Sequence, residues 1–250
     1  MIKQDEINQA LERAYQEFRP FSGFYEREKK TYRFLLNLIT RHASGNKKII
    51  DIGTGIGIIP LALKFLGLES CGIDKYIFSM DELDKIEAIW GKNNLLISDY
   101  DMAKDQDVSK IGSFDVVLSS STIEHIKSPR IFLQNIKGLL NPGGLAMILT
   151  PNASFISKRI RFLFGFSPFC ELKKFFDSDG DKFSGHWREY TLKELKQMCV
   201  WTGLKVVEAK NIDNSPYRLK SPRDLYYLFL KLISVILTGG KRAIIIICQK

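Results

Sequence analysis

The stretch IIDIGTGIGIIPLAL, residues 49–63, decides the fold of this chain. Apolar residues lead into Asp51, glycines alternate at positions 53, 55 and 57, and a second apolar run follows. Glycine permits a tight turn and lets the backbone approach a ligand closely, and the first turn of a helix offers unpaired N–H donors. We therefore predict a strand over residues 47–52, a ligand-binding turn, and a helix over residues 56–66.

Outward from this turn, apolar strands and helices alternate. Continuous rather than alternating apolar strands are typical of a parallel sheet that is covered by helices on both faces. The apolar runs predict further strands at residues 71–74, 95–98, 114–119, 145–150, 205–208 and 243–248. The helical patterns lie in the first 45 residues and at residues 80–90, 128–140 and 192–201.

Composition limits the classes that the chain can belong to. Apolar residues make up 45% and charged residues 26%, as in an ordinary globular domain. The four cysteines are scattered without a C-x-x-C pair, so we expect no metal site and no redox motif. The polar N-terminal segment lacks the apolar core of a signal peptide, and we expect a cytoplasmic protein.

The glycine spacing excludes the dinucleotide fingerprint G-x-G-x-x-G. Counted from Gly53, the sixth position is Ile58, and counted from Gly55 it is Pro60. The pattern present is D-x-G-x-G-x-G, with an acid at the end of the strand. A nicotinamide-dependent oxidoreductase is therefore disfavoured.

Four further segments give the glycine turn a context. They are CGID (71–74), LLISDYD (95–101), FDVVLSSSTIEHI (114–126) and LLNPGGLAMILTPN (139–152). With these motifs in this order, the chain resembles the class I S-adenosylmethionine-dependent methyltransferases over residues 47–208 and the last strand. The resemblance implies a single α/β domain, residues 1–250, built on a Rossmann-like seven-stranded sheet with helices on both faces.

The resemblance also implies how the cofactor, S-adenosylmethionine, is held. Asp74 would accept hydrogen bonds from the ribose hydroxyls, and Asp99 or the Tyr100 backbone would meet the adenine, although Asp101 is a near competitor. Ser119 would lie near the sulfonium. The full set of predicted cofactor-binding residues is Asp51, Gly53, Gly55, Gly57, Asp74, Lys75, Asp99, Tyr100 and Ser119; the product would be S-adenosylhomocysteine.

Around this core we expect four parts. Residues 1–45 form a helical cap, residues 46–150 the cofactor-binding core, and residues 151–191 an insertion that acts as a lid over the acceptor. Residues 192–250 complete the sheet and contain a helical insertion at 211–240. Loops at the carboxyl ends of strands bind ligands in such sheets.

Histidine is the usual base near neutral pH, and the chain has three. His125 follows Glu124 after the fourth strand, and His186 lies in GHWREY, a segment that resembles one in many small-molecule methyltransferases. Both are catalytic candidates, and a structural hydrogen bond is the alternative for each. His42 lies in the N-terminal helices.

For the acceptor, we expect a small molecule, a lipid-linked molecule or a glycan, methylated at oxygen. The position after the fourth strand reads SSST, unlike the Asn/Asp-Pro-Pro-aromatic tetrad of adenine-amino enzymes, so nucleic acid is disfavoured. RNA or protein methylation, or a scaffold without catalysis, remains the alternative. The oligomeric state stays open.

The charge is unevenly distributed. From Pro151 onward there are 18 basic and 9 acidic residues, whereas the first 150 residues hold 19 of each, so the net charge of +9 lies in the last hundred. Residues 158–169, KRIRFLFGFSPF, and residues 225–237, LYYLFLKLISVIL, have the composition of interfacial segments. The second is too short to span a bilayer. Residues 225–237 are expected to form a core helix beside the last strand, with a place in a membrane interface as the alternative. The hypothesis that joins the two segments is reversible peripheral contact with a membrane, and lid and core packing is its alternative.

Overall fold

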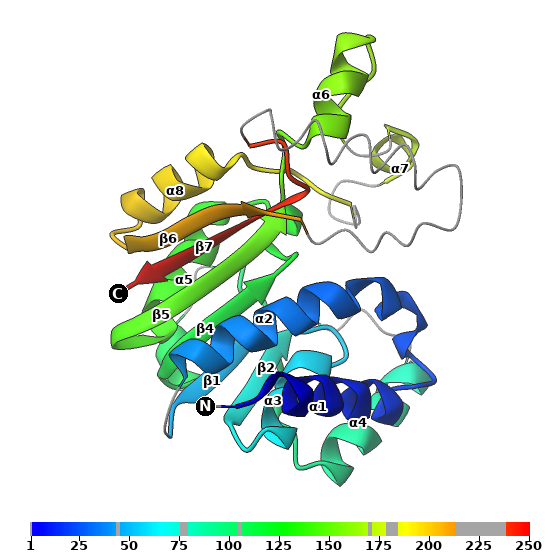
Figure 1. Cartoon of the computed structure of the whole chain (residues 1–250), viewed down its shortest axis with the longest axis vertical. Coiled ribbons are helices and arrows are strands. Elements are labelled where there is room, and N and C mark those ends of the chain that lie inside the picture. The colour runs from blue at the N-terminus through cyan, green and yellow to red at the C-terminus, as the bar shows by residue number, and fades with distance from the viewer. Residues whose placement is uncertain are drawn as a thin grey trace.

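Figure 1 shows the computed structural model of the chain. The structure describes residues 2–43, 46–75, 80–104, 107–169, 172–178, 185–213 and 239–250. One seven-stranded sheet forms its centre, with the strand order β3-β2-β1-β4-β5-β7-β6. The strands are β1 (Lys48–Ile52), β2 (Glu69–Asp74), β3 (Ile97–Asp99), β4 (Phe114–Ser120), β5 (Leu140–Pro151), β6 (Lys205–Ile212) and β7 (Ala243–Gln249).

The first five strands are parallel, as predicted, but β7 is not. It lies between β5 and β6 and runs antiparallel to both, with Ile148 opposite Ile246. The prediction of a parallel sheet is therefore wrong at this edge. A strand buried on both faces has the same apolar pattern whichever way it runs, so its sequence does not reveal its direction.

Eight α-helices lie in the described part of the chain. They are α1 (Gln4–Glu17), α2 (Lys29–His42), α3 (Ile58–Phe65), α4 (Met80–Lys92), α5 (Pro129–Leu139), α6 (Ile156–Leu163), α7 (Leu172–Phe176) and α8 (Leu192–Trp201). The first four contribute to one apolar cluster, and α5 and α8 to a second. Helices therefore cover both faces of the sheet.

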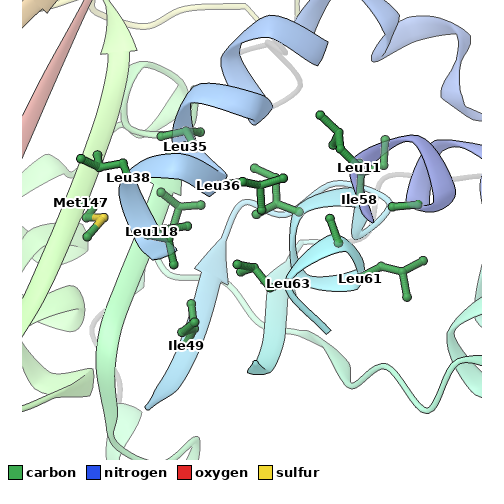
Figure 2. Close-up of a cluster of buried hydrophobic side chains, with 14 of the residues drawn as sticks. Leu11, Leu35, Leu36, Leu38, Ile49, Ile58, Leu61, Leu63, Leu118 and Met147 are labelled. Atoms are coloured by element: carbon green, nitrogen blue, oxygen red, sulfur yellow. The ribbon is translucent and has the colours of Figure 1, made fainter. Parts of the chain in front are cut away.

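The sheet separates these two clusters because successive side chains of a strand point to opposite faces. In β4, Val116 and Leu118 belong to the first cluster and Val117 to the second. Figure 2 shows Leu36 of α2 and Leu63 of α3 near Leu118. All three are fully buried, and truncating such a leucine to alanine costs about 2–5 kcal/mol.

Several element ends differ from the predictions. Strand β5 begins at Leu140 rather than 145, because Leu140 already pairs with Phe114. The register then shifts so that Val116 lies opposite Leu145, and the Pro-Gly-Gly stretch forms the irregularity between the two pairs. Strand β6 continues to Ile212, so the predicted insertion at 211–240 begins later than expected. Most of that insertion, including residues 225–237, lies outside the described residues.

Candidate active site

The glycine turn between β1 and α3 needs glycine for two reasons. Gly53, Gly55 and Gly57 have φ values of +73°, +59° and +91°, which side chains other than glycine's rarely adopt. A Cβ on Gly55 would also lie 2.7 Å from the Tyr25 hydroxyl oxygen, and one on Gly53 would lie 2.1 Å from Thr122 Oγ1. The turn is therefore closely enclosed by the N-terminal cap and by the loop after β4.

Two carboxyl groups flank this turn. Asp74, at the end of β2, accepts a hydrogen bond from the Gly55 amide at 2.5 Å, and burial raises its pKa while this bond opposes the rise. Asp51 is buried, and its Oδ2 accepts from Thr54 Oγ1 at 2.9 Å. Burial raises the pKa of Asp51 to about 7. Both predicted acids thus lie at the turn, and Asp51 supports it from within.

The third predicted acid stands at the neighbouring strand end. Asp99 in β3 lies opposite Asp74 in the parallel register and is exposed, while the Tyr100 amide donates to the Asp74 carbonyl. Its competitor Asp101 accepts from the Ala103 amide and pairs with Lys75, with Nζ and Oδ2 3.4 Å apart. The Asp101 carboxylate is therefore already engaged in its own turn. Asp99 remains the better candidate for binding the adenine of the cofactor. Lys75 lies at the rim, and its amide supports Asp74.

These groups fit the predicted cofactor. A turn that excludes side chains leaves backbone close to a ligand, and neighbouring strand ends present carboxylates to hydroxyl and amino groups. Ser119, near the end of β4, adds a buried hydroxyl oxygen without a hydrogen-bond partner in the described residues. A buried polar group in that state calls for a ligand or a water.

Tyr25 is a site residue that the sequence did not indicate. It lies in the cap, between α1 and α2, and its hydroxyl accepts a hydrogen bond from the Ile56 amide. Its carbonyl accepts from the Tyr15 hydroxyl at 2.7 Å, and burial raises the pKa of Tyr25. The cap thus reaches the glycine turn directly, through an aromatic residue that belongs to no motif.

The two predicted catalytic histidines lie together. The ring centroids of His125 and His186 are 4.8 Å apart and the rings are nearly perpendicular, although 60 residues separate them in the chain. Glu124 is fully buried, and its Oε2 accepts a hydrogen bond from Thr150 Oγ1 of β5 at 2.8 Å. We call these three residues, Glu124, His125 and His186, the Glu–His cluster.

Backbone hydrogen bonds hold this cluster in place. The Trp187 amide donates to the Glu124 carbonyl at 2.8 Å, and His125 Nδ1 lies 3.1 Å from the Gly185 carbonyl oxygen. On the other side, His186 Nδ1 lies 2.9 Å from Glu189 Oε1, and Lys158 pairs with the same carboxylate. The segment after the lid is therefore fastened to the end of β4.

Burial sets the charge states of the cluster. Burial raises the pKa of Glu124 to about 7, with the Thr150 hydrogen bond and the Lys158 charge opposing it. Burial, followed by the nearby His125 and Lys158, lowers the pKa of His186 to about 4. His186 is therefore neutral at pH 7. The sequence pointed to Glu124 only as part of the EH pair, since burial is not visible in a motif.

The insertion after β5 has a different surface. Helices α6 and α7 lie at its exposed end, away from the sheet (Figure 1). Phe164 is 75% exposed, and its exposed apolar neighbours are Phe162, Leu163, Phe166 and Phe169. Within the described residues, no helix is both long and apolar enough to cross a membrane.

Comparison with known proteins places this geometry in a family. The model of a family described as a methyltransferase domain matches residues 15–209. The chain is 27% identical over 133 residues to the ubiquinone biosynthesis O-methyltransferase of Bradyrhizobium diazoefficiens, and 30% identical over 144 residues to that of Bartonella tribocorum. These alignments cover 53% and 57% of this chain, and 51% and 57% of the relatives' own lengths.

A third relative matches over a longer range. It is the enzyme of the same name from Parvibaculum lavamentivorans, 23% identical over 229 residues, which cover 87% of this chain and 84% of the relative.

Solved structures agree on the fold. A chain in the complex of the Haloferax volcanii Trm112 methyltransferase activator with a methyltransferase has a TM-score of 0.63 at 16% identity, over 98% of this chain and 96% of that one. A Clostridium acetobutylicum S-adenosylmethionine-dependent methyltransferase has a TM-score of 0.60 at 11% identity, over 93% and 98%. The Rossmann-like fold predicted from the sequence is confirmed.

Proposed function

The chain belongs to the class I S-adenosylmethionine-dependent methyltransferases, and we propose that it methylates an oxygen atom of a small hydroxylated acceptor. The observation that carries the acceptor class is the Glu–His cluster at the end of β4, where a neutral imidazole stands beside a buried carboxyl. An alcohol or phenol must lose a proton when its oxygen is methylated, and this cluster offers the groups for that loss.

We call the glycine turn and the ends of β2 and β3 the donor side. Its residues would bind and orient S-adenosylmethionine. Bound S-adenosylmethionine supplies a methyl group activated on a sulfonium. The glycine turn leaves space at the backbone, and Asp74 and Asp99 present carboxylates from neighbouring strand ends. Correct alignment alone supplies a large part of the acceleration in such a displacement.

We call the Glu–His cluster and the segment bonded to it, residues 185–189, the acceptor side. Its residues would remove the proton of the acceptor hydroxyl. His186 Nδ1 faces the Glu189 carboxylate and His125 Nδ1 faces a carbonyl oxygen, so each Nδ1 donates. In that tautomer the lone pair of each ring is on Nε2. One Nε2 takes the acceptor proton as the oxygen attacks the methyl carbon, and the Glu124 carboxylate stabilises the imidazolium that forms.

The named relatives support oxygen as the methylated atom, because all three are O-methyltransferases. Incubation with radiolabelled S-adenosylmethionine and separate glycan, lipid, RNA and protein fractions tests the acceptor class, with catechol as a defined hydroxyl probe. We expect label in catechol, in the glycans or in the lipids. Label found only in RNA or protein would refute the proposal.

The exposed end of the lid supports a narrower acceptor, one held at a membrane. Helix α6 carries Arg159 and Arg161 and continues into the exposed Phe164 and Phe166. Basic residues beside exposed aromatic ones are the composition of an interfacial anchor. We therefore propose that the lid contacts anionic lipid and admits a lipid-linked acceptor.

Co-sedimentation of the full chain with phosphatidylglycerol vesicles tests the membrane proposal. We expect sedimentation with these vesicles at low salt, little with phosphatidylcholine vesicles, and loss of binding in Phe164→Ser/Phe166→Ser. Absence of sedimentation with either vesicle at low salt would refute it and leave the segment as a lid.

A further inference from the structure

We infer that the Glu–His cluster binds a divalent cation of the zinc class through Glu124, His125 and His186. One ligand atom from each of the three side chains lies within 4.8 Å of the other two. Ligands at Zn–N distances of about 2.0–2.1 Å in a tetrahedron are about 3.3 Å apart, so the three atoms must draw together. The exposed side chain of His125 leaves room for that movement.

The buried carboxylate gives the first independent reason. Glu124 is 0% exposed, and its Oε2 is held by Thr150 while its Oε1 is buried without a hydrogen-bond partner in the part of the chain that the structure describes. Buried polar atoms nearly always have a partner, so one without a partner in the described residues calls for an ion, another ligand or a water. The carboxylate of Glu124 lies close to the imidazoles of His125 and His186, so an ion bound by Oε1 would be within reach of both rings.

The hydrogen bonds outside the cluster give a second reason. A histidine that ligates a metal through one ring nitrogen usually donates from the other to a carbonyl or a carboxylate. His125 Nδ1 faces the Gly185 carbonyl oxygen at 3.1 Å, and His186 Nδ1 faces Glu189 Oε1 at 2.9 Å. Both rings therefore present Nε2 as the ligating nitrogen. Lys158 in turn pairs with Glu189, which fixes that carboxylate.

The donor set selects the ion. Two imidazoles and one carboxylate suit Zn²⁺ and Co²⁺, whereas Mg²⁺ and Ca²⁺ prefer oxygen ligands. Three protein ligands leave a coordination position open, as in catalytic zinc sites. The cation site revises the expectation of no metal, which rested on cysteine spacing and did not consider histidines that are distant in the sequence.

The open position also assigns a role, and this part rests on the proposed function. The oxygen of the acceptor hydroxyl would coordinate the cation. The cation would lower the pKa of this hydroxyl, so that the hydroxyl proton passes to water. The oxygen then forms a bond to the methyl carbon, the carbon–sulfur bond breaks, and its electron pair stays on sulfur. Each Nε2 lone pair can serve as a ligand or as a base but not as both. The cation therefore replaces the histidine base of the proposed function, and only the proposed reaction, methylation of a hydroxyl oxygen, is kept.

Calorimetric titration of the tag-free, chelator-treated chain with ZnCl₂ tests the site, and Co²⁺ absorption reports the ligands. We expect one Zn²⁺ per chain, a tetrahedral Co²⁺ spectrum without a thiolate charge-transfer band, and no competition from tenfold Mg²⁺. Glu124→Gln and His186→Ala should each weaken Zn²⁺ binding about tenfold or more. His42→Ala, a histidine on α2, is the matched control and should change nothing.

Each variant is also titrated with S-adenosylhomocysteine, and unchanged affinity shows that the fold is intact. No Zn²⁺ binding by the native chain, or equal binding by Glu124→Gln and His186→Ala, would overturn the cation site. If Zn²⁺ binds as expected but no hydroxyl acceptor is methylated, the proposed function fails and the site stands. Full transfer activity after chelation would overturn only the role of the cation.

Discussion

The donor side and the acceptor side of this molecule are built in different ways. The donor side is a turn in which three glycines leave no room for side chains, enclosed by Tyr25 and Thr122. The acceptor side joins the end of β4 to a segment more than fifty residues later through hydrogen bonds, and an ion pair between Lys158 and Glu189 ties that segment to α6. Charge differs too, since the first 150 residues are neutral overall and the last hundred carry the excess of +9.

We relate this difference to the two ligands: the cofactor always has the same shape, whereas acceptors differ from one methyltransferase to another. In the function proposed above, backbone geometry that tolerates almost no change would bind a cofactor of fixed shape, whereas side chains on loops would bind the acceptor. The two sides should therefore respond separately to substitution.

The largest expected effect concerns the donor side. Gly55→Ala should lower S-adenosylhomocysteine affinity by about a hundredfold, because φ is +59° and the new Cβ would lie 2.7 Å from the Tyr25 hydroxyl oxygen. Gly67→Ala is the matched control, since Gly67 has a φ of +76° but nothing within 4 Å of a Cβ. It should keep its affinity, measured by calorimetry. Equal losses in both variants would show that backbone strain, and not the enclosed turn, matters.

A smaller effect is expected at the end of β2. Asp74→Ala should weaken S-adenosylmethionine binding by about 1.5–3 kcal/mol, because charged hydrogen bonds are lost. Asp101→Ala, a neighbouring acid that closes its own turn, should weaken it far less. Calorimetry measures the affinity of both variants. Unchanged affinity in Asp74→Ala would show that Asp74 does not bind the ribose hydroxyls.

Asp51 should make the stability of the donor side depend on pH. Burial raises its pKa from 3.8 to about 7 in the folded chain, so its contribution to stability is fully present below pH 3.8 and is lost as the pH rises through about 7. Asp51→Asn should therefore raise Tm by several degrees at pH 8 and by less at pH 5. Thermal unfolding at both values measures this, and an equal gain at both would contradict the assignment.

The smallest effect on stability is expected at the lid. Phe164→Ser should change the free energy of unfolding by no more than about 0.5 kcal/mol, because the side chain is 75% exposed. Phe132→Ser, fully buried under the sheet, is the contrast and should be strongly destabilising. A large loss of stability in Phe164→Ser would mean that the lid packs on the core in solution.

The sequence indicates the candidate donor side because the constraints there are local, and the binding of the cofactor by these residues stays a prediction. Alternating glycines after an apolar strand and acids at strand ends lie within short motifs, and Asp74 and Asp99 were found in adjacent register. Periodicity could not predict the direction of β7, because an apolar strand such as residues 243–249 reads alike in both directions.

The acceptor side resisted prediction because its contacts are distant in the sequence. His125 and His186 were each candidates, yet nothing in their spacing indicated that their rings meet. The burial of Glu124 and the enclosure of the turn by Tyr25 depend on packing between segments that no motif connects. Such groups become visible only when the sheet brings the segments together.

The most direct test of the account is the single-turnover rate of methyl transfer to catechol, or to the fraction that accepts label, at saturating S-adenosylmethionine. The comparison is between the native chain and His125→Ala/His186→Ala. We predict a rate lower by about a hundredfold or more with unchanged S-adenosylhomocysteine affinity, because the acceptor side alone is damaged. A rate within about threefold of the native value would contradict it, since alignment on the donor side would then suffice.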